Sequence, residues 1–271
     1  MFVQVFMQGR LKETLPQILE GCGYRTLMLF PMDKGFLSLD RFYRSIGFSE
    51  ILDRRAQGAP TDRERDSFYF RNAVETMELH FNSSDQPLFL YVQTMAAHGP
   101  YDRAYMPEEN VPGGGPGTSA EMSEYLRRAA MAKRDGDFLI DEIKRRFPHE
   151  SILVVRYGDH QPSATHDLIN GEWGDESPEY RDGRAPSPYI TFYAIAGQNY
   201  LVPPLPHHDL LDIAYLGTVI LDVAGLPLSE AHRERKRLMV TCQGRYFGCE
   251  PHSQILAFHR RLINSGLVRA P

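Results

Sequence analysis

The chain has 271 residues, of which 42% are hydrophobic and 24% are charged, and this is enough for one large globular core. Its 35 acidic and 30 basic residues are interspersed and give a formal net charge of -5, which excludes a basic face for nucleic acid or anionic lipid. No run of about 18 apolar residues occurs, and the N-terminal stretch MFVQVFMQGRLKETL is too short and too soon charged for a signal peptide or a membrane span.

The spacing of apolar residues predicts helices that alternate with strands along most of the chain. The expected elements, in chain order, are a helix over 11–21, a strand over 24–30, helices over 39–48 and 61–81, a strand over 87–95, a helix over 119–146, strands over 151–159 and 188–197, and a helix over 209–225. Thr61 is expected to begin the long helix over 61–81. The apolar run over 87–95 is continuous, as in strands that are covered on both faces.

This order of elements predicts an α/β fold, a layered α/β/α arrangement with a largely parallel central sheet. The end of the chain differs, because 236–244 and 244–249 indicate a hairpin and 253–267 indicates a helix. We therefore expect a main domain over 1–237 and a C-terminal hairpin and helix over 238–271 that pack on the same core.

Three cysteines are too few for a disulfide framework, and none lies in a CxxC zinc pattern. Cys22 is expected to be a small buried residue at a helix end. Cys242 and Cys249 bracket a turn that contains glycine, so they are either a disulfide, if the compartment is oxidising, or two free thiols.

Two loops that follow apolar strands carry potentially reactive side chains. In open α/β sheets, ligands bind at the carboxyl ends of strands, and MAAHGPYD (95–102) and GDHQP (158–162) both occupy this position. Asp159 and His160 offer a carboxylate oxygen and an imidazole nitrogen, which suit a divalent cation such as zinc or manganese. The alternative is that Asp159 caps the following turn and His160 is an ordinary hydrogen-bonded histidine.

Other side chains near these loops are also candidates. Gly99 and Pro100 place His98 in a tight turn, which suits either a side chain presented to a ligand or a simple exit from the strand. His166 and Asp167 follow the second loop and could supply further metal ligands or hydrogen-bonding partners for the ligands.

The stretches FLYVQTMAAHGPYD and VVRYGDHQP, some sixty residues apart, resemble the sulfatase-like branch of the alkaline phosphatase superfamily, especially its phosphoethanolamine and phosphoglycerol transferases. The resemblance covers about residues 10 to 230. It implies that Asp159 and His160 are paired ligands of Zn or Mn, and that His98 contacts the phosphoryl oxygens or the leaving group. It also implies a small-molecule or lipid-linked phosphate or sulfate ester as substrate, and a periplasmic or cell-envelope location for a parent anchored in the inner membrane.

The chain departs from the pattern of this family at its start. The family's nucleophile, a threonine, a serine or a formylglycine, lies on the first strand and the start of the next helix, whereas here no Ser, Thr, Asp or Glu precedes Glu13. We therefore expect the first strand and the nucleophile to lie upstream of residue 1, with MFVQVFM as a partial substitute edge strand.

Two functions remain open at this point. The first is a metal-dependent hydrolase or transferase of phosphate or sulfate esters that is incomplete in this chain, and the second is a catalytically silent binding module with the same fold. Phosphoglycerol transferases carry a histidine and a Trp-Asn-Arg group where this chain has Phe30 and Leu37-Ser38-Leu39. This difference favours a group other than phosphoglycerol.

Overall fold

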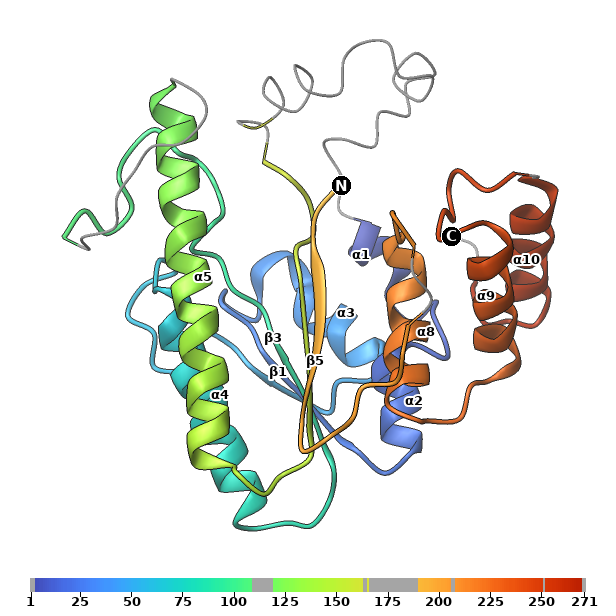
Figure 1. The fold of residues 1–271 in the computed structure, drawn as a ribbon, viewed down its shortest axis with the longest axis horizontal. Helices are drawn as coiled ribbons and strands as arrows, with labels where there is room; N and C mark the ends of the chain where they lie inside the picture. The colour runs from blue at the N-terminus through green and yellow to red at the C-terminus, as the bar shows by residue number, and fades with distance from the viewer. Residues whose placement is uncertain are drawn as a thin grey trace. The chain divides into compact units, whose positions relative to one another are not determined.

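The computed structural model describes residues 3–108, 119–162, 165, 190–205, 208–250 and 252–269. Its principal elements are α1 (Val3–Met7), α2 (Leu15–Gly21), β1 (Arg25–Leu29), η1 (Phe36–Ser38), α3 (Leu39–Ser45), β2 (Glu50–Leu52), α4 (Asp66–Phe81), β3 (Leu88–Val92), α5 (Ala120–Arg146), β4 (Ile152–Tyr157), β5 (Tyr193–Gln198), α8 (Ile213–Val223), α9 (Glu230–Thr241) and α10 (His252–Asn264), as Figure 1 shows. The chain divides into two compact units, the first made of Met1–Ala56, His80–Tyr91 and Tyr200–Pro271, and the second of Gln57–Leu79 and Val92–Asn199.

The first unit is built on a parallel three-stranded sheet in the order β2-β1-β3. β1 and β2 pair in parallel, with Leu27 opposite Glu50. The four residues of β1 after Arg25 are buried, as expected of a strand covered on both faces. A core cluster of Met28, Phe30, Phe48 and Ile51 packs beside it. The predicted strand over 24–30 is confirmed, whereas the short strand β2 was not predicted.

The N-terminal segment of the first unit is helical. The predicted edge strand in MFVQVFM is wrong, because Val3–Met7 forms the short helix α1. The next helix, α2, begins later than predicted, because Thr14 and Gln17 form a reciprocal capping box that fixes its first turn. Gly47 lies against this turn with φ of 104°, and a Cβ there would lie 2.6 Å from the Gln17 nitrogen, so the close approach requires glycine.

The predicted C-terminal hairpin is also wrong, since Glu230–Thr241 is the helix α9. Ser229 caps its first turn by accepting a hydrogen bond from the His232 N–H at 3.4 Å. A strand would turn Leu238 and Met239 to opposite faces, whereas in the helix both are buried. The predicted terminal helix is confirmed as α10.

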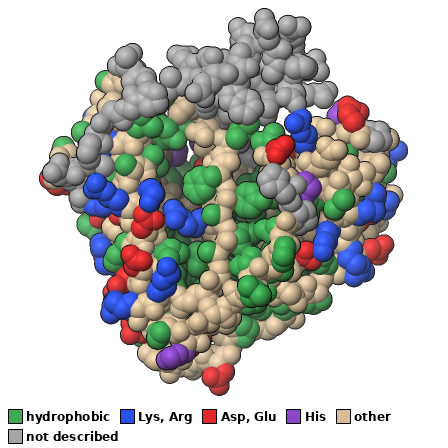
Figure 2. All heavy atoms as spheres, in the orientation of Figure 1, with side chains coloured by type: hydrophobic (Ala, Val, Ile, Leu, Met, Phe, Trp, Pro, Cys, Tyr) green, Lys and Arg blue, Asp and Glu red, His purple; other side chains and the backbone are tan. Residues whose placement is uncertain are grey.

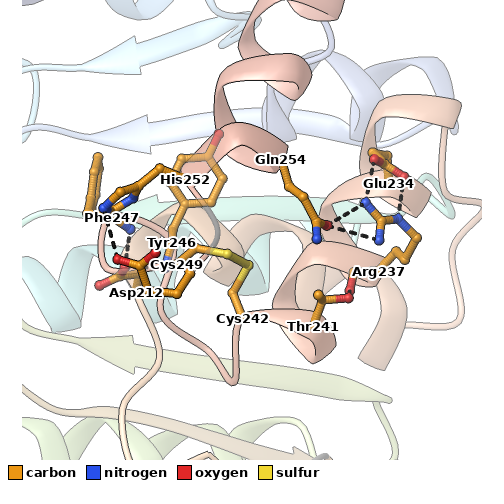
Figure 3. The surroundings of a disulfide bond; sticks show 11 residues. Asp212, Glu234, Arg237, Thr241, Cys242, Tyr246, Phe247, Cys249, His252 and Gln254 are labelled. Atoms are coloured by element: carbon orange, nitrogen blue, oxygen red, sulfur yellow. Dashed lines mark hydrogen bonds and ion pairs between the residues drawn. A yellow bond between two sulfur atoms is a disulfide. The ribbon is translucent and has the colours of Figure 1, made fainter.

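A disulfide joins Cys242, at the end of α9, to Cys249. Both residues are buried, and Figure 3 shows the turn between them held by Asp212. The Asp212 carboxylate accepts hydrogen bonds from the backbone N–H groups of Tyr246 and Phe247, the latter at 2.8 Å. The alternative of two free thiols is therefore excluded, and Cys22 is the free cysteine.

The second unit contains the long helices α4 and α5 and a two-stranded sheet, in which β4 and β5 are antiparallel. The predicted α/β class holds, but the parallel arrangement does not extend to this pair. α5 matches its prediction closely and is capped by Ser119. α4 begins at Asp66 rather than at Thr61, whose hydroxyl bonds Glu64 in the preceding turn at 2.8 Å.

Charged and apolar side chains are distributed unevenly over the second unit. Basic and acidic side chains alternate along α5 at the left of Figure 2, in keeping with the near balance of charges in the sequence. β4 was predicted to be buried, yet none of its six residues is buried in the described structure. The apolar side chains of β4 are thus only partly covered by the described part of the second unit.

Candidate functional site

The loop that follows β3 carries His98. Hydrogen bonds to Asp66, the first residue of α4, hold the start of this loop. The buried Asp66 carboxylate accepts a hydrogen bond from the Ala96 N–H at 3.1 Å, and the Thr94 hydroxyl and Met95 N–H also donate to it. Burial is the main cause that raises the pKa of Asp66 to about 6, and the nearby Asp135 carboxylate adds to the rise. Asp66 therefore ties the end of β3 to the start of α4.

His98 itself is exposed, but its ring is oriented by the backbone. Nδ1 lies 2.7 Å from the Gly99 carbonyl oxygen. Because a carbonyl oxygen only accepts hydrogen bonds, the neutral form of this ring has its hydrogen on Nδ1 and its lone pair on Nε2. The turn includes the cis peptide bond Gly99–Pro100, and the Tyr101 hydroxyl donates to the Ala97 carbonyl at 2.7 Å.

The second loop follows β4 and carries Asp159 and His160. Gly158 precedes them, and its N–H donates to the Phe192 carbonyl at 3.0 Å. His160 Nδ1 lies 3.0 Å from the Gln161 carbonyl, so this ring too has its hydrogen on Nδ1 in the neutral form. His160 Nε2 faces Asp159 Oδ2 at 3.5 Å, and the two side chains are 55% and 80% exposed.

The Asp159 carboxylate is also close to its own backbone, since Oδ1 accepts from the His160 N–H at 3.0 Å. This bond joins neighbouring residues, whereas a cap of the following turn would accept from an N–H two or three residues further on. It uses one carboxylate oxygen, and Oδ2 stays beside His160 Nε2.

Helix α5 connects the two loops. The rings of Tyr101 and Tyr125 are in edge contact with centroids 5.6 Å apart, and the Tyr125 hydroxyl donates to Gln161 Oε1 at 3.3 Å. Burial raises the pKa of Tyr101 to about 12, and Tyr125 and the charge of Asp159 add to this rise. Tyr101 of the first loop and Gln161 of the second loop thus both contact Tyr125 of α5.

Three charged residues of α5, Glu124, Arg127 and Arg128, are buried against the first loop. Glu124 Oε1 accepts from the Tyr105 N–H at 2.7 Å, and Arg127 donates to the Tyr105 and Met106 carbonyls at 2.6 and 2.8 Å. The sequence contained a signal for them, because charges at i, i+3 and i+4 share one face of a helix. The sequence analysis assigned no role to this face, and these residues were missed.

The metal site stays a prediction within the described residues. Asp159 and His160 are adjacent and supply oxygen and nitrogen donors suited to a borderline cation. No group of three His, Cys, Asp or Glu side chains with metal-site geometry occurs within the described ranges. His166 and Asp167 lie outside the described residues, so their predicted part stays a prediction.

An open hollow of about 370 Å³ lies at the N-terminal end of α4, in the second unit. Arg65 and Arg71 line it together with Glu64 and Glu108. It contains none of the predicted site residues, and its charges are of both signs. We assign no ligand to it.

The described helices include none with the length and apolar character needed to span a membrane.

The sequence matches the model of the sulfatase family over residues 6–201. This match covers most of the chain, and the chain belongs to the sulfatase family. It is also 24% identical over 227 residues to an uncharacterized protein of Haemophilus influenzae, covering 80% of this chain. The chain spans 39% of the length of that relative.

Three solved structures share the fold. They are the Streptococcus pyogenes phosphoglycerol transferase GacH in complex with sn-glycerol-1-phosphate (TM-score 0.62, 18% identity), a protein in the alkaline phosphatase superfamily from Vibrio parahaemolyticus (0.58, 15%) and the lipoteichoic acid synthase LtaP from Listeria monocytogenes (0.55, 19%). The matches cover 90%, 85% and 71% of this chain and 60%, 59% and 48% of those chains, respectively. The family match over residues 6–201 confirms the predicted sulfatase-like family, and the solved structures confirm the α/β fold.

Proposed function

We propose that the chain carries part of the site of a metal-dependent enzyme that hydrolyses or transfers phosphate or sulfate esters. The carrying observation is the pair of strand-end loops, in which His98 and His160 each have Nδ1 bound to a carbonyl oxygen. Metal-binding and proton-transferring histidines are commonly oriented in this way, since the second nitrogen then faces the ligand. Asp159 adds a carboxylate beside His160.

In this proposal Asp159 and His160 hold zinc or manganese, and His98 contacts the group that is transferred. When bound, such an ion polarises a phosphoryl or sulfuryl oxygen and stabilises the charge that develops on it. Catalytic sites usually use three or more protein ligands, so we propose that His166 or Asp167 adds to the set.

The fold neighbours support phosphate esters as the substrate class, because GacH is a phosphoglycerol transferase with bound sn-glycerol-1-phosphate. The group transferred is a finer question. Phe30 is buried in the core, and Leu37 and Ser38 bring no charged group to the segment after β1. We therefore keep the proposal that the group is not phosphoglycerol, with phosphoethanolamine, another phospho-alcohol or a sulfate ester in its place.

We also propose a cell-envelope, periplasmic location. The disulfide Cys242–Cys249 supports it, because such bonds persist in oxidising compartments and are rare in the cytosol.

The metal part is tested by thermal unfolding of the chain with Zn²⁺ or Mn²⁺. A ligand at a hundred times its dissociation constant stabilises the folded state by about 2.7 kcal/mol, roughly 5 °C for a chain of this size. Asp159→Ala and His160→Ala are expected to abolish the rise in melting temperature.

The matched control is Glu250→Ala, because Glu250 and His252, at the start of α10, form a similarly exposed acid-imidazole pair at 3.2 Å. This variant is expected to keep the full rise. If Glu250→Ala abolished the metal-induced rise in melting temperature and Asp159→Ala kept it, the metal would bind at Glu250 and His252, which would contradict the proposal. Metal binding without turnover of aryl phosphate or sulfate esters, even after the upstream coding sequence is restored, would favour the silent binding module.

A further inference from the structure

The main chain around His98 is held by one buried guanidinium, that of Arg128 on α5. Arg128 donates to the His98 carbonyl at 2.8 Å and to the Pro100 and Arg103 carbonyls at 3.0 Å each. Its Nε donates to Glu124 Oε1 at 2.7 Å. One side chain thus fixes three carbonyl groups of the loop that carries His98.

Burying this cation is costly unless its hydrogen-bonding groups are matched. Arg128 is 4% exposed, and Glu124, at 8%, supplies the opposite charge. The rings of Tyr101 and Tyr105 lie 5.0 and 5.2 Å from the guanidinium carbon, within the range of cation–π attraction. The planar fork of arginine suits this arrangement, whereas lysine offers a single point charge with no fixed fork.

The contacts of Arg128 bear directly on the orientation of the His98 ring. The carbonyls of His98 and Pro100 both accept hydrogen bonds from Arg128, so the peptide groups that precede and follow the Gly99–Pro100 peptide are restrained. The Gly99 carbonyl is then left facing His98 Nδ1 at 2.7 Å. In a neutral imidazole the bond that one nitrogen makes decides which nitrogen keeps the lone pair.

We propose that Arg128 is a positioning residue: through the main chain of residues 98–103 it holds His98 with the hydrogen on Nδ1 and the lone pair on Nε2. In this form Nε2 can accept a proton from the hydroxyl group or water that attacks a bound phosphate or sulfate ester, and can then donate it to the leaving oxygen. The inference deepens the proposed function and rests on it for the role of His98. The orientation of the ring, however, is measurable without substrate or metal.

The test is nuclear magnetic resonance of the full chain with ¹⁵N-labelled histidine, at mildly alkaline pH where imidazoles are neutral. The chain has 10 histidines, and a His98→Gln variant identifies the His98 signals. Wild-type His98 is expected to show the Nδ1-protonated form. The same chain unfolded in urea gives the reference for a ring whose two neutral forms interconvert.

Arg128→Gln and Arg128→Lys are expected to shift the His98 signals towards the unfolded reference, because neither side chain can hold three carbonyls as the guanidinium does. The matched control is Arg127→Gln, which removes another buried arginine from the same helix. Arg127 donates to the carbonyls of Tyr105 and Met106, which lie farther along the loop than His98. This variant is expected to leave the His98 signals in place. Circular dichroism selects the temperature at which all variants are folded.

Unchanged His98 signals in both Arg128 variants would overturn the proposal, and so would an equal shift in Arg127→Gln, which would mean general loosening of the loop. Failure of the proposed function gives a different result. In that case zinc and manganese leave the melting temperature unchanged while the Arg128 variants still shift the His98 signals.

Discussion

At the scale of single residues, the same side-chain to backbone hydrogen bond occurs in both loops of the candidate site. His98 and His160 each bind the carbonyl oxygen of the next residue through Nδ1. A histidine followed by a turn can make this contact without help from distant residues, so the side chain is oriented by local sequence. Asp159 and His160 could therefore be proposed as site residues from sequence, whereas the groups that hold the loops could not.

Asp66 provides a prediction for this scale. Its native pKa of about 6 lies above the value of about 3.9 for an unfolded aspartate, so the native state binds more protons between these values. Its contribution to stability is therefore fully present below about pH 4 and is lost as the pH rises through about 6. Two pKa units correspond to about 3 kcal/mol.

We expect Asp66→Asn to remove this dependence. The free energy of unfolding, measured with urea between pH 4 and pH 7, should fall less with pH in the variant than in the wild type. The control is Asp137→Asn, because Asp137 is exposed and the Lys133 ammonium lowers its pKa, which moves its effect below this window. If the free energies of unfolding of the wild type and of Asp66→Asn fell in parallel with pH, ionisation of Asp66 would not destabilise the folded state, and the prediction would be wrong.

At the scale of elements, the accuracy of the sequence predictions followed the locality of their signals. α5 was placed well, because its cap Ser119 and its apolar spacing are local. α9 was mistaken for a hairpin, because a short run such as Leu238–Thr241 fits both a strand and a helix. Its helical form is supported by contacts with distant residues, including the bond of Thr218 to His232 at 2.8 Å.

Gly158, between β4 and Asp159, gives a prediction at this scale. A Cβ at Gly158 would lie 2.1 Å from the Thr191 hydroxyl oxygen, which is closer than any normal contact. We expect Gly158→Ala to destabilise the second unit by about 1–3 kcal/mol, the usual cost of overpacking. Adding Thr191→Ala should recover most of this loss, measured as a double-mutant cycle in urea.

Gly217 in α8 is the matched control, since a Cβ there meets nothing within 4 Å. Gly217→Ala is expected to stabilise the helix by up to about 1 kcal/mol, because alanine is the better helix former. Additive effects of Gly158→Ala and Thr191→Ala would contradict the proposed clash. If metal-induced stabilisation were lost in Gly158→Ala and recovered in the double variant, the backbone conformation at the end of β4 would be needed for metal binding by Asp159.

At the scale of the whole molecule, the α/β class and the two strand-end loops were predictable, because the alternation of helices and strands along the chain follows from the apolar pattern. Two features were not. The antiparallel pairing of β4 with β5 is a long-range choice that periodicity does not encode. The buried ion pair of Glu124 and Arg128 also runs against the expectation that charged residues are solvated, and only the loop carbonyls explain it.

The disulfide was left open by the sequence, and it gives a prediction for the chain as a whole. With a separation of 7 residues, closing this loop is expected to stabilise the folded state by about 2.5 kcal/mol through the entropy of the unfolded chain. Alkylation in denaturant should add one label without reductant, at Cys22, and three after reduction. Reductant should lower the urea midpoint of the wild type and of Cys22→Ser equally, but not that of the Cys242→Ser and Cys249→Ser double variant. Three labels without reductant, from a chain exported to an oxidising compartment, would contradict both the bond and its support for an envelope location.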